Sequence, residues 1–185
     1  MEDIVTKKNE IRSQTRELKN ELSEDQKAQA ADSVFKKIEL FPEFKSAKKI
    51  LMYWSTTDEL PTHKFVEKWS VEKEILLPSV VGDDIVIKKY SAKENLKKGN
   101  LGIYEPEADS LYTGKIDLTI VPGVAFDLKM NRLGRGKGYY DRFFVNKRIV
   151  KIGVGFDFQL LESVPTQQYD IKMDKIITPS FILAI

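Results

Sequence analysis

The sequence has 185 residues, 42% of them hydrophobic, and its 30 basic residues nearly balance 28 acidic ones. This size predicts a single domain over residues 1–185, and so small an excess of positive charge argues against a nucleic-acid-binding protein. Without cysteine, a long apolar run or a signal-peptide core, the chain is expected to be cytoplasmic, with no disulfide, thiolate zinc site or membrane span.

Two successive helices are predicted at the N-terminus. The first covers residues 3–21, where apolar side chains recur at near-helical spacing. This narrow apolar stripe consists of Ile4, Ile11, Leu18 and Leu22. The second helix begins after Ser23, which forms a capping-box pattern with Gln26, and runs to about Leu40 before Pro42 ends it. Its predicted buried face includes Ala30, Val34 and Ile38.

From residue 48 onwards, short apolar runs replace the helical pattern and predict buried strands. Residues 48–54, 74–80 and 85–90 form three such runs. A short helix from Pro61 to about Trp69 separates the first two. The Gly82-Asp83 turn predicts an antiparallel hairpin between the second and third strands, at an edge of the sheet.

The second half of the chain also alternates strands with helices. Residues 91–116 are polar and are predicted to be mostly loop. Strands are predicted at 117–123, 149–156 and 175–178, and helices at 138–146 and 159–162. The whole pattern predicts a single three-layer α/β domain, with a mostly parallel sheet, helices on both faces and an N-terminal helical pair. Ligands of such sheets bind beyond the carboxyl ends of the strands, and strand 117–123 leads toward a glycine-rich segment.

That segment, NRLGRGKGYYD at residues 131–141, predicts a phosphate-binding loop. Gly134, Gly136 and Gly138 allow a tight turn that brings backbone N–H groups close to an anion, and the following helix adds its dipole. Charged donors are supplied by Arg132, Arg135 and Lys137. The spacing matches neither the Walker loop nor the dinucleotide fingerprint, and a solvated basic turn with structural glycines remains an alternative.

The sequence resembles the 5-formyltetrahydrofolate cyclo-ligase family, also called methenyltetrahydrofolate synthetases. The resemblance covers essentially the whole chain and is most specific in VPGVAFD (121–127) and NRLGRGKGYYDRF (131–143). Supporting pieces lie at residues 8–12, 55–62, 100–106 and 169–178.

This resemblance implies an ATP- and Mg²⁺-dependent enzyme of folate and one-carbon metabolism. Its substrate would be 5-formyltetrahydrofolate, with or without a polyglutamate tail, and its product 5,10-methenyltetrahydrofolate. The N5-formyl oxygen would be phosphorylated by ATP and N10 would then attack, with release of ADP and phosphate.

The resemblance also implies the residues of the site. Catalytic roles fall on Arg135, Lys137 and Tyr139. Contacts to ATP fall on Lys8, Arg12, Arg132, Leu133, Gly134, Arg135, Gly136, Lys137, Gly138, Tyr139 and Tyr140. Contacts to the folate fall on Trp54, Glu59, Arg135, Gly136, Lys137, Gly138 and Tyr139, and at Trp54 only the location is carried over. The Mg²⁺ ligands fall on Asp141 and Asp170.

Two residues depart from the family pattern. Met130 stands where glycine often precedes the Asn-Arg of the loop, which puts the geometry of that turn in question. Tyr169 stands where histidine is frequent before the aspartate. Neither departure removes a charged group from the expected chemistry.

Without the resemblance, the same residues have structural interpretations. Glu59 fits a surface carboxylate, Lys8 and Arg12 fit a solvated helix face, and the two aspartates fit helix caps or ion pairs.

Two other functional classes also remain open. One is a non-catalytic nucleotide- or phosphate-binding module. The other is an RNA-binding protein using the basic stretch 132–148, against which the near-neutral charge counts. We expect a monomer that binds ATP and a folate, without a nucleic-acid or membrane partner.

Overall fold

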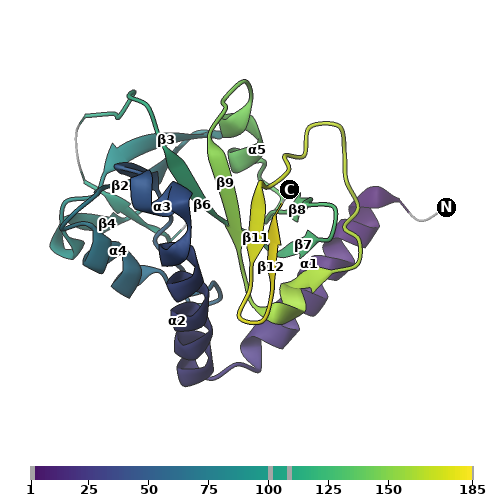
Figure 1. Ribbon diagram of the computed structural model, residues 1–185. Helices are drawn as coiled ribbons and strands as arrows, with labels where there is room; N and C mark the ends of the chain where they lie inside the picture. Colours follow the sequence, from purple (N-terminus) through teal and green to yellow (C-terminus); the bar gives the residue numbers. More distant parts are fainter. Residues whose placement is uncertain (1–2, 100–101, 108–109, 185) are drawn as a thin grey trace.

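A seven-stranded sheet organises the computed structural model, which describes residues 3–99, 102–107 and 110–184 (Figure 1). The strands in order across the sheet are β12 (Ile182–Ala184), β11 (Lys175–Ile177), β9 (Val150–Val154), β6 (Leu118–Pro122), β1 (Lys49–Leu51), β2 (Glu74–Val81) and β3 (Asp84–Lys89). The five central strands are parallel, and the two edge strands, β12 and β3, are antiparallel to their neighbours. The predicted mostly parallel sheet and its edge hairpin are confirmed.

Helices cover both faces of this sheet, which gives the predicted three layers. One face is packed by α2 (Glu24–Leu40), α3 (Pro42–Ser46) and α4 (His63–Trp69), and the other by α5 (Tyr139–Phe144). The predicted capping box is present, since the Ser23 hydroxyl accepts from the Gln26 N–H and the Gln26 side chain accepts from the Ser23 N–H. No helix in the described ranges is long and apolar enough to cross a membrane.

The first helix, α1 (Ile4–Asn20), buries only part of its predicted apolar stripe. Ile11 and Leu22 are partly buried against the core. Ile4 and Leu18 of the predicted apolar stripe are 42% and 41% exposed. The buried residues of this helix are instead polar, namely Lys8, Thr15 and Lys19. The helix diverges from α2 and lies beside a small second sheet (Figure 1), where a polar face meets the site described below.

Several short elements fall where no regular pattern exists in the sequence. The predicted loop 91–116 contains a 3₁₀ turn, η1 (Lys93–Asn95), and a two-stranded hairpin of β4 (Leu96–Lys98) and β5 (Tyr104–Pro106). The predicted helix 159–162 is a 3₁₀ turn, η2 (Asp157–Gln159), followed by β10 (Leu160–Leu161). Strand β10 pairs with β7 (Ala125–Asp127), which pairs with β8 (Arg132–Leu133). Strands of two or three residues show no period, so tertiary pairing decides them. Residues 100–101 of the family-like segment 100–106 lie outside the described ranges.

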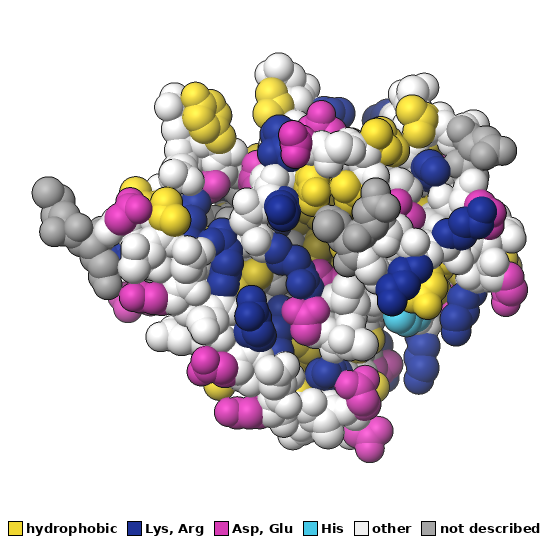
Figure 2. Space-filling view, turned by 180° about the vertical axis from the view of Figure 1, so that it is seen from behind, with side chains coloured by type: hydrophobic (Ala, Val, Ile, Leu, Met, Phe, Trp, Pro, Cys, Tyr) yellow, Lys and Arg dark blue, Asp and Glu magenta, His cyan; other side chains and the backbone are white. Residues whose placement is uncertain are grey.

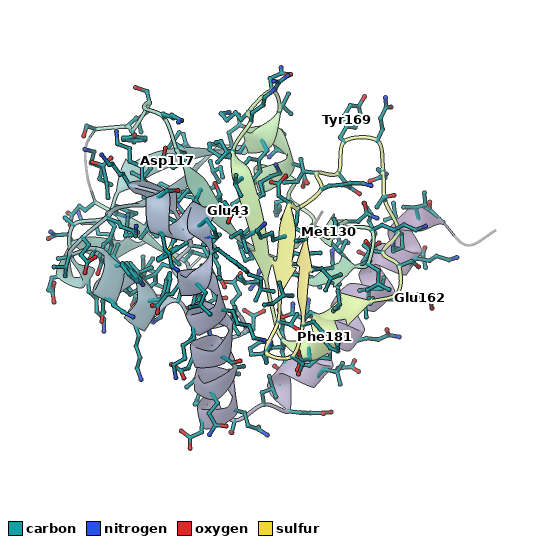
Figure 3. All side chains as sticks on the ribbon, viewed as in Figure 1. Glu43, Asp117, Met130, Glu162, Tyr169 and Phe181 are labelled. Atoms are coloured by element: carbon teal, nitrogen blue, oxygen red, sulfur yellow. The ribbon has the colours of Figure 1, made fainter. Side chains whose placement is uncertain are left out.

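The turn between β7 and β8 contains Met130 in the left-handed region, at φ +69°. Glycine adopts this conformation without strain, which explains why a departure from glycine matters here. Met130 is 4% exposed and packs in a cluster with Phe126 and Met173 (Figure 3), so apolar burial offsets the backbone strain. The other departure, Tyr169, is 81% exposed on the loop before β11 (Figure 3) and makes no part of the core.

Asp127 holds the same turn from inside. Its side chain is almost fully buried, and its Oδ1 accepts from the Lys129 and Asn131 N–H groups, both at 2.9 Å. Its Oδ2 accepts from Asn131 Nδ2 at 2.8 Å and from the Val164 N–H at 2.9 Å. Burial alone would raise the pKa of Asp127, but these hydrogen bonds outweigh burial and hold that pKa below its ordinary value.

Replacing Asp127 by asparagine should lower the free energy of unfolding by about 1–3 kcal/mol at pH 7, because an amide NH₂ would then face two N–H donors. The folded-state pKa lies below the unfolded value of about 3.9. The carboxylate therefore contributes stability above that pH, and the contribution is lost as the pH falls toward the folded-state pKa. Urea unfolding at pH 7 and in steps from pH 5 to 2 measures this.

The exposed, ion-paired Asp32 supplies the control. Its asparagine variant should stay within about 0.5 kcal/mol of the parent at pH 7. The difference in unfolding free energy between the parent and the Asp127 variant should shrink as the pH falls. A difference that stayed constant would contradict the role assigned to the carboxylate.

Candidate functional site

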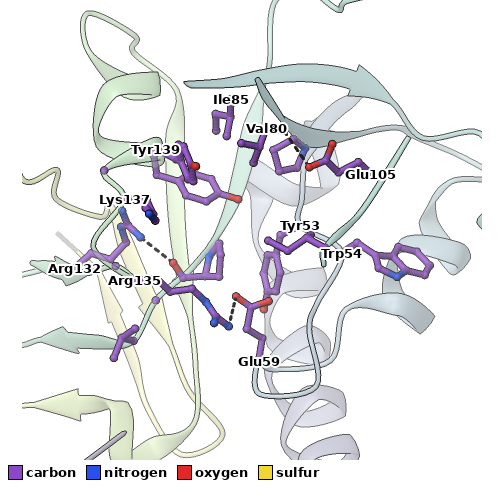
Figure 4. A pocket seen from close by; sticks show the side chains of 18 of the residues that line it. Tyr53, Trp54, Glu59, Val80, Ile85, Glu105, Arg132, Arg135, Lys137 and Tyr139 are labelled. Atoms are coloured by element: carbon purple, nitrogen blue, oxygen red, sulfur yellow. Dashed lines mark hydrogen bonds and ion pairs between the residues drawn. The ribbon is translucent and has the colours of Figure 1, made fainter. Parts of the chain in front are cut away.

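A pocket lies at the carboxyl ends of β1 and β6, where the chain order of the sheet reverses (Figure 4). From β1 the chain continues to β2 on one side, whereas β6 lies on the other side of β1. Loops that leave such neighbouring strands in opposite directions open a crevice between them. The predicted site residues Trp54 and Glu59 and the predicted loop 132–140 all contribute walls to this crevice.

The pocket has an apolar wall and a charged wall. The apolar wall comes from the β2–β3 hairpin and the segment before β5, with Pro78, Val80, Ile85 and Ile103. The charged wall comes from Arg132, Arg135 and Lys137, and Figure 4 shows Val80 and Ile85 across from these side chains. A ligand with a flat apolar part and an anionic part matches this division.

The glycine-rich loop has the backbone that its sequence predicted. Gly136 and Gly138 have φ of +98° and +69°, so both lie in the region that favours glycine. This conformation turns the chain sharply between β8 and α5 and exposes Lys137. The Lys137 ammonium has no hydrogen-bond or ion-pair partner among the described residues, so its positive charge is available to a ligand.

Arg135 links the glycine-rich loop to the segment that follows β1. Its Nη2 lies 2.6 Å from Asp58 Oδ1 and 3.3 Å from Glu59 Oε1, and it donates to Thr56 Oγ1 at 3.0 Å. Glu59 Oε2 also accepts from the Thr56 N–H at 2.9 Å. The structure therefore brings two predicted site residues, Glu59 and Arg135, into direct contact at the pocket (Figure 4).

The aromatic residues at the site differ in how they face it. The Trp54 ring stacks on His63 at 4.2 Å between ring centroids and on Tyr90 at 5.7 Å, and Figure 4 shows it pointing away from the loop. Tyr139 lines the pocket, with the Arg142 guanidinium 5.6 Å from its ring centroid. The predicted position of Trp54 beside the pocket is observed, and its ring contributes mainly to the core.

Arg132 and Tyr140 carry buried polar atoms without partners. Arg132 Nη1 donates to the Pro122 carbonyl at 3.1 Å and Nη2 to Asp141 Oδ2 at 3.2 Å, with the Tyr140 ring 5.4 Å from the guanidinium. Arg132 Nε and the Tyr140 hydroxyl have no hydrogen-bond partner within the described ranges. Burial, and next the Glu59 carboxylate, raise the pKa of Tyr140 well above its ordinary value. Orphaned donors at a pocket are what a ligand would satisfy.

Helix α1 reaches the loop from the other side. Arg12 Nε donates to the Gly134 carbonyl at 3.1 Å, and Lys8 Nζ lies 2.6 Å from Asp170 Oδ2. Of the two α1 residues that the resemblance assigned to ATP, Arg12 therefore contacts the loop and Lys8 contacts the segment that contains Asp170. Leu133 is buried in a cluster with Ala125 and away from the pocket, which leaves only its backbone near the loop.

The two predicted metal ligands lie in neighbouring segments. Asp141 Oδ1 accepts from the N–H of Ile171, the residue that follows Asp170, at 3.2 Å. Each aspartate is already paired with a cation, Asp141 with Arg132 and Asp170 with Lys8. No group of three or more His, Cys, Asp or Glu side chains suited to a metal exists in the part of the chain that is described. These residues fit a Mg²⁺ site only if phosphate oxygens complete it.

The sequence did not indicate the apolar wall. Residues 85–90 were predicted as a strand, but nothing in that pattern says which face of the hairpin meets the ligand. Ile103 and Tyr104 lie in a stretch predicted as loop, and they reach the pocket because β5 lies against β2, where the Val80 N–H donates to Glu105 Oε1 at 3.1 Å. The apolar runs of the β2–β3 hairpin predicted strands but did not indicate a ligand.

Comparison with known proteins supports the resemblance. The model of the 5-formyltetrahydrofolate cyclo-ligase family matches residues 4–179. The chain is 30% identical over 181 residues to the 5-formyltetrahydrofolate cyclo-ligase of Haemophilus influenzae, covering 92% of this chain and 97% of that protein. It is 31% identical over 180 residues to the enzyme of Escherichia coli K12, with the same coverage.

Solved structures confirm the fold. The solution structure of 5,10-methenyltetrahydrofolate synthetase from Aquifex aeolicus has a TM-score of 0.85 at 34% identity, covering 95% of this chain and 91% of that one. The synthetase from Mycoplasma pneumoniae has a TM-score of 0.75 at 23% identity, covering 94% and 99%, and bears on the fold alone.

Removing the Tyr140 hydroxyl should cost the ligand-free protein nothing. The Tyr140→Phe variant should keep the parent's free energy of unfolding or gain up to about 1 kcal/mol, because the hydroxyl is buried without a partner. Tyr53→Phe is the matched control, since the Tyr53 hydroxyl donates to the Leu60 carbonyl at 3.0 Å, and it should lose about 1 kcal/mol. Urea unfolding measures both, and equal losses would show that Tyr140 has a partner.

Proposed function

The chain belongs to the 5-formyltetrahydrofolate cyclo-ligase family and is an enzyme of that class, and we propose that it uses ATP to convert 5-formyltetrahydrofolate to 5,10-methenyltetrahydrofolate. In the proposed reaction the N5-formyl oxygen attacks the γ-phosphorus and ADP leaves. N10 then attacks the formyl carbon and loses its proton, and the C–O bond breaks as phosphate departs. Phosphorylation is needed because a formamide oxygen is a poor leaving group.

The observation that carries this proposal is the pairing of an apolar wall with a cationic glycine-rich loop in one pocket. The two substrates have the matching chemistry, a flat pterin ring and a triphosphate. Holding them together would convert a bimolecular encounter into a reaction of neighbouring groups.

The phosphates are assigned to the loop. Lys137 is exposed and unpaired within the described residues, and Arg132 presents a buried Nε without a partner, so both have donors to spare. The turn at Gly136 and Gly138 leaves the backbone N–H groups open to close approach. Charge that develops on the transferred phosphoryl group would be stabilised most by Arg135, Lys137 and the hydroxyl of Tyr139.

The folate is assigned to the opposite wall. Glu59 has a carboxylate 13% exposed at the pocket, where it can accept from paired N–H groups of a pterin ring. Its contact with Arg135 at 3.3 Å orients it toward the loop. Val80 and Ile85 supply apolar surface for the ring face.

Asp141 and Asp170 are the residues that would hold Mg²⁺. When bound, the ion supplies neutralisation of phosphate charge. For this, Arg132 and Lys8 would exchange their aspartate partners for phosphate oxygens. The salt bridges that would be exchanged are those of Arg132 with Asp141 and of Lys8 with Asp170.

Removing the Lys137 charge should lower turnover about 30- to 1000-fold, because a charged hydrogen bond to developing phosphate charge contributes about 2–4 kcal/mol. The Lys137→Ala variant is mixed with ATP, Mg²⁺ and 5-formyltetrahydrofolate, and the absorbance band of the methenyl product is followed. Lys129→Ala, which removes an exposed lysine from the β7–β8 turn, should keep the parent rate. Near-normal turnover of Lys137→Ala at saturating ATP would show that Lys137 does not stabilise the transferred phosphoryl group.

If Asp141 and Asp170 share one ion, each asparagine variant should raise the Mg²⁺ concentration that gives the half-maximal rate. The double variant should lose less than the product of the single losses, because residues acting as one unit are not additive. Asp174→Asn, at an exposed carboxylate paired with Lys151, should leave the Mg²⁺ dependence unchanged. If the losses of rate multiplied and the Mg²⁺ dependence did not change, the two aspartates would have no role beyond their ion pairs.

A further inference from the structure

A second cavity borders the main pocket at Val124 and Arg135. Its remaining walls are Asp58 and four residues of α1, namely Arg12, Thr15, Arg16 and Lys19. These four repeat at intervals of three, one and three residues, so they share one face of the helix. Figure 2 shows Lys and Arg side chains crowded around a hollow on the face of the molecule opposite to that of Figure 1. We call this cavity the α1 pocket.

Lys19 is the unusual member of the α1 pocket. It is 4% exposed, yet its ammonium makes no hydrogen bond or ion pair with any of the described residues. Burial lowers the pKa of Lys19, and the more distant Asp58 and Glu59 carboxylates do not compensate. The Thr15 hydroxyl, in a residue also 4% exposed, likewise lacks a hydrogen-bond partner in the described ranges. The Lys19 ammonium and the Thr15 hydroxyl are not fully enclosed by the chain and line the cavity, where a ligand can supply the missing partner.

The charges around the α1 pocket do not balance. Four cations line it, Arg12, Arg16, Lys19 and Arg135, against the single carboxylate of Asp58. That carboxylate is already held by Arg135 at 2.6 Å. Arg12 is also engaged, with the Gly134 carbonyl and with Asn9 Oδ1 at 2.7 Å. Arg16 and Lys19 therefore make no ion pair with a carboxylate among the described residues, and the nearest carboxylates, Asp58 and Glu59, are held by Arg135.

The position of the α1 pocket separates it from the proposed metal end of the site. Lys8, which pairs with Asp170, and Lys19 are eleven residues apart, or about 16 Å along the helix at 1.5 Å per residue. One phosphate group cannot contact both. An anion beside Lys19 is therefore a different group from the one beside Asp141 and Asp170.

We propose that the α1 pocket is an oxyanion-binding site, for a carboxylate or a phosphate, in which Lys19 and Arg16 supply the charge and Thr15 a hydroxyl. Two sources carry such a group close to Arg135: the glutamyl tail of a folate and the phosphates of a nucleotide. The site itself follows from the unpaired cations, and only the choice of source rests on the proposed function.

The test measures binding directly, without turnover. Calorimetry gives the Kd of three probes, N-(4-aminobenzoyl)-L-glutamate, ATP and inorganic phosphate, for the parent, Lys19→Met and Arg16→Gln. Loss of one charged hydrogen bond should weaken at least one probe about tenfold in Lys19→Met, and Arg16→Gln should weaken the same probe. Weakening of the aminobenzoylglutamate identifies the tail as the source, and weakening of ATP identifies the nucleotide.

A stability measurement separates this role from a structural one. Lys19→Met should unfold at a higher urea concentration than the parent, because it removes a buried charge that has no partner. Lys36→Met, which removes an exposed lysine paired with Asp32 on α2, is the control and should change neither the binding nor the unfolding midpoint appreciably.

Unchanged Kd values for all three probes in both variants would overturn the proposal, as would a lower unfolding midpoint for Lys19→Met. Because Arg16 is exposed, Arg16→Gln keeps the test open if Lys19→Met does not fold. Absence of methenyl product from the parent would count against the proposed function and would leave these binding results unaffected.

Discussion

The buried carboxylate of Asp127 fixes the turn from which the glycine-rich loop departs. Four N–H groups converge on this one side chain, two of them from Asn131, so the path of the chain into β8 has little freedom. Next to it, the Phe126 ring packs so closely on Gly123 and Gly153 that a Cβ atom at either glycine would lie 2.4–2.5 Å from the ring. These contacts fix both the turn before Arg132 and the strand ends beneath it. The Arg132 side chain is therefore oriented toward the pocket.

The electrostatics of the site rest on carboxylates that hold cations in place. Asp141 holds Arg132, Asp170 holds Lys8, and Asp58 holds Arg135. Without such partners, several like charges around one pocket would repel one another and the loop would lose its shape. The same ion pairs weaken the binding of an anion, because the anion must compete with each carboxylate for its cation. Lys137 and Lys19 make no ion pair among the described residues, so a bound anion would not have to displace a carboxylate from them.

Sequence patterns predicted those elements that are stabilised by residues close together in the chain. The capping box of α2 and the hairpin of β2 and β3 were readable because each depends on residues a few positions apart. The short strands β7, β8 and β10 were not, since two or three residues become a strand only when a distant segment pairs with them. The loop was predictable from composition, because left-handed backbone at Gly136 and Gly138 requires glycine. The apolar wall depended on which side of the hairpin faces the loop, and that is a property of the assembled sheet.

Helix α1 shows that apolar periodicity identifies a buried face only in part, since Ile11 and Leu22 pack against the core but Ile4 and Leu18 are exposed. Apolar residues mark the inward face of a helix only when that face meets a core, whereas α1 turns Lys8, Thr15 and Lys19 inward. These polar residues repeat at intervals of seven and four, a spacing that fits one face of a helix as well as the spacing of the apolar stripe does. Lys8 has a partner in Asp170, but burial of Lys19 without an ion pair lowers stability, which is expected where a residue serves a ligand. A polar stripe of helical period, carrying mostly one sign of charge, is therefore better interpreted as the wall of a binding site than as a solvated surface.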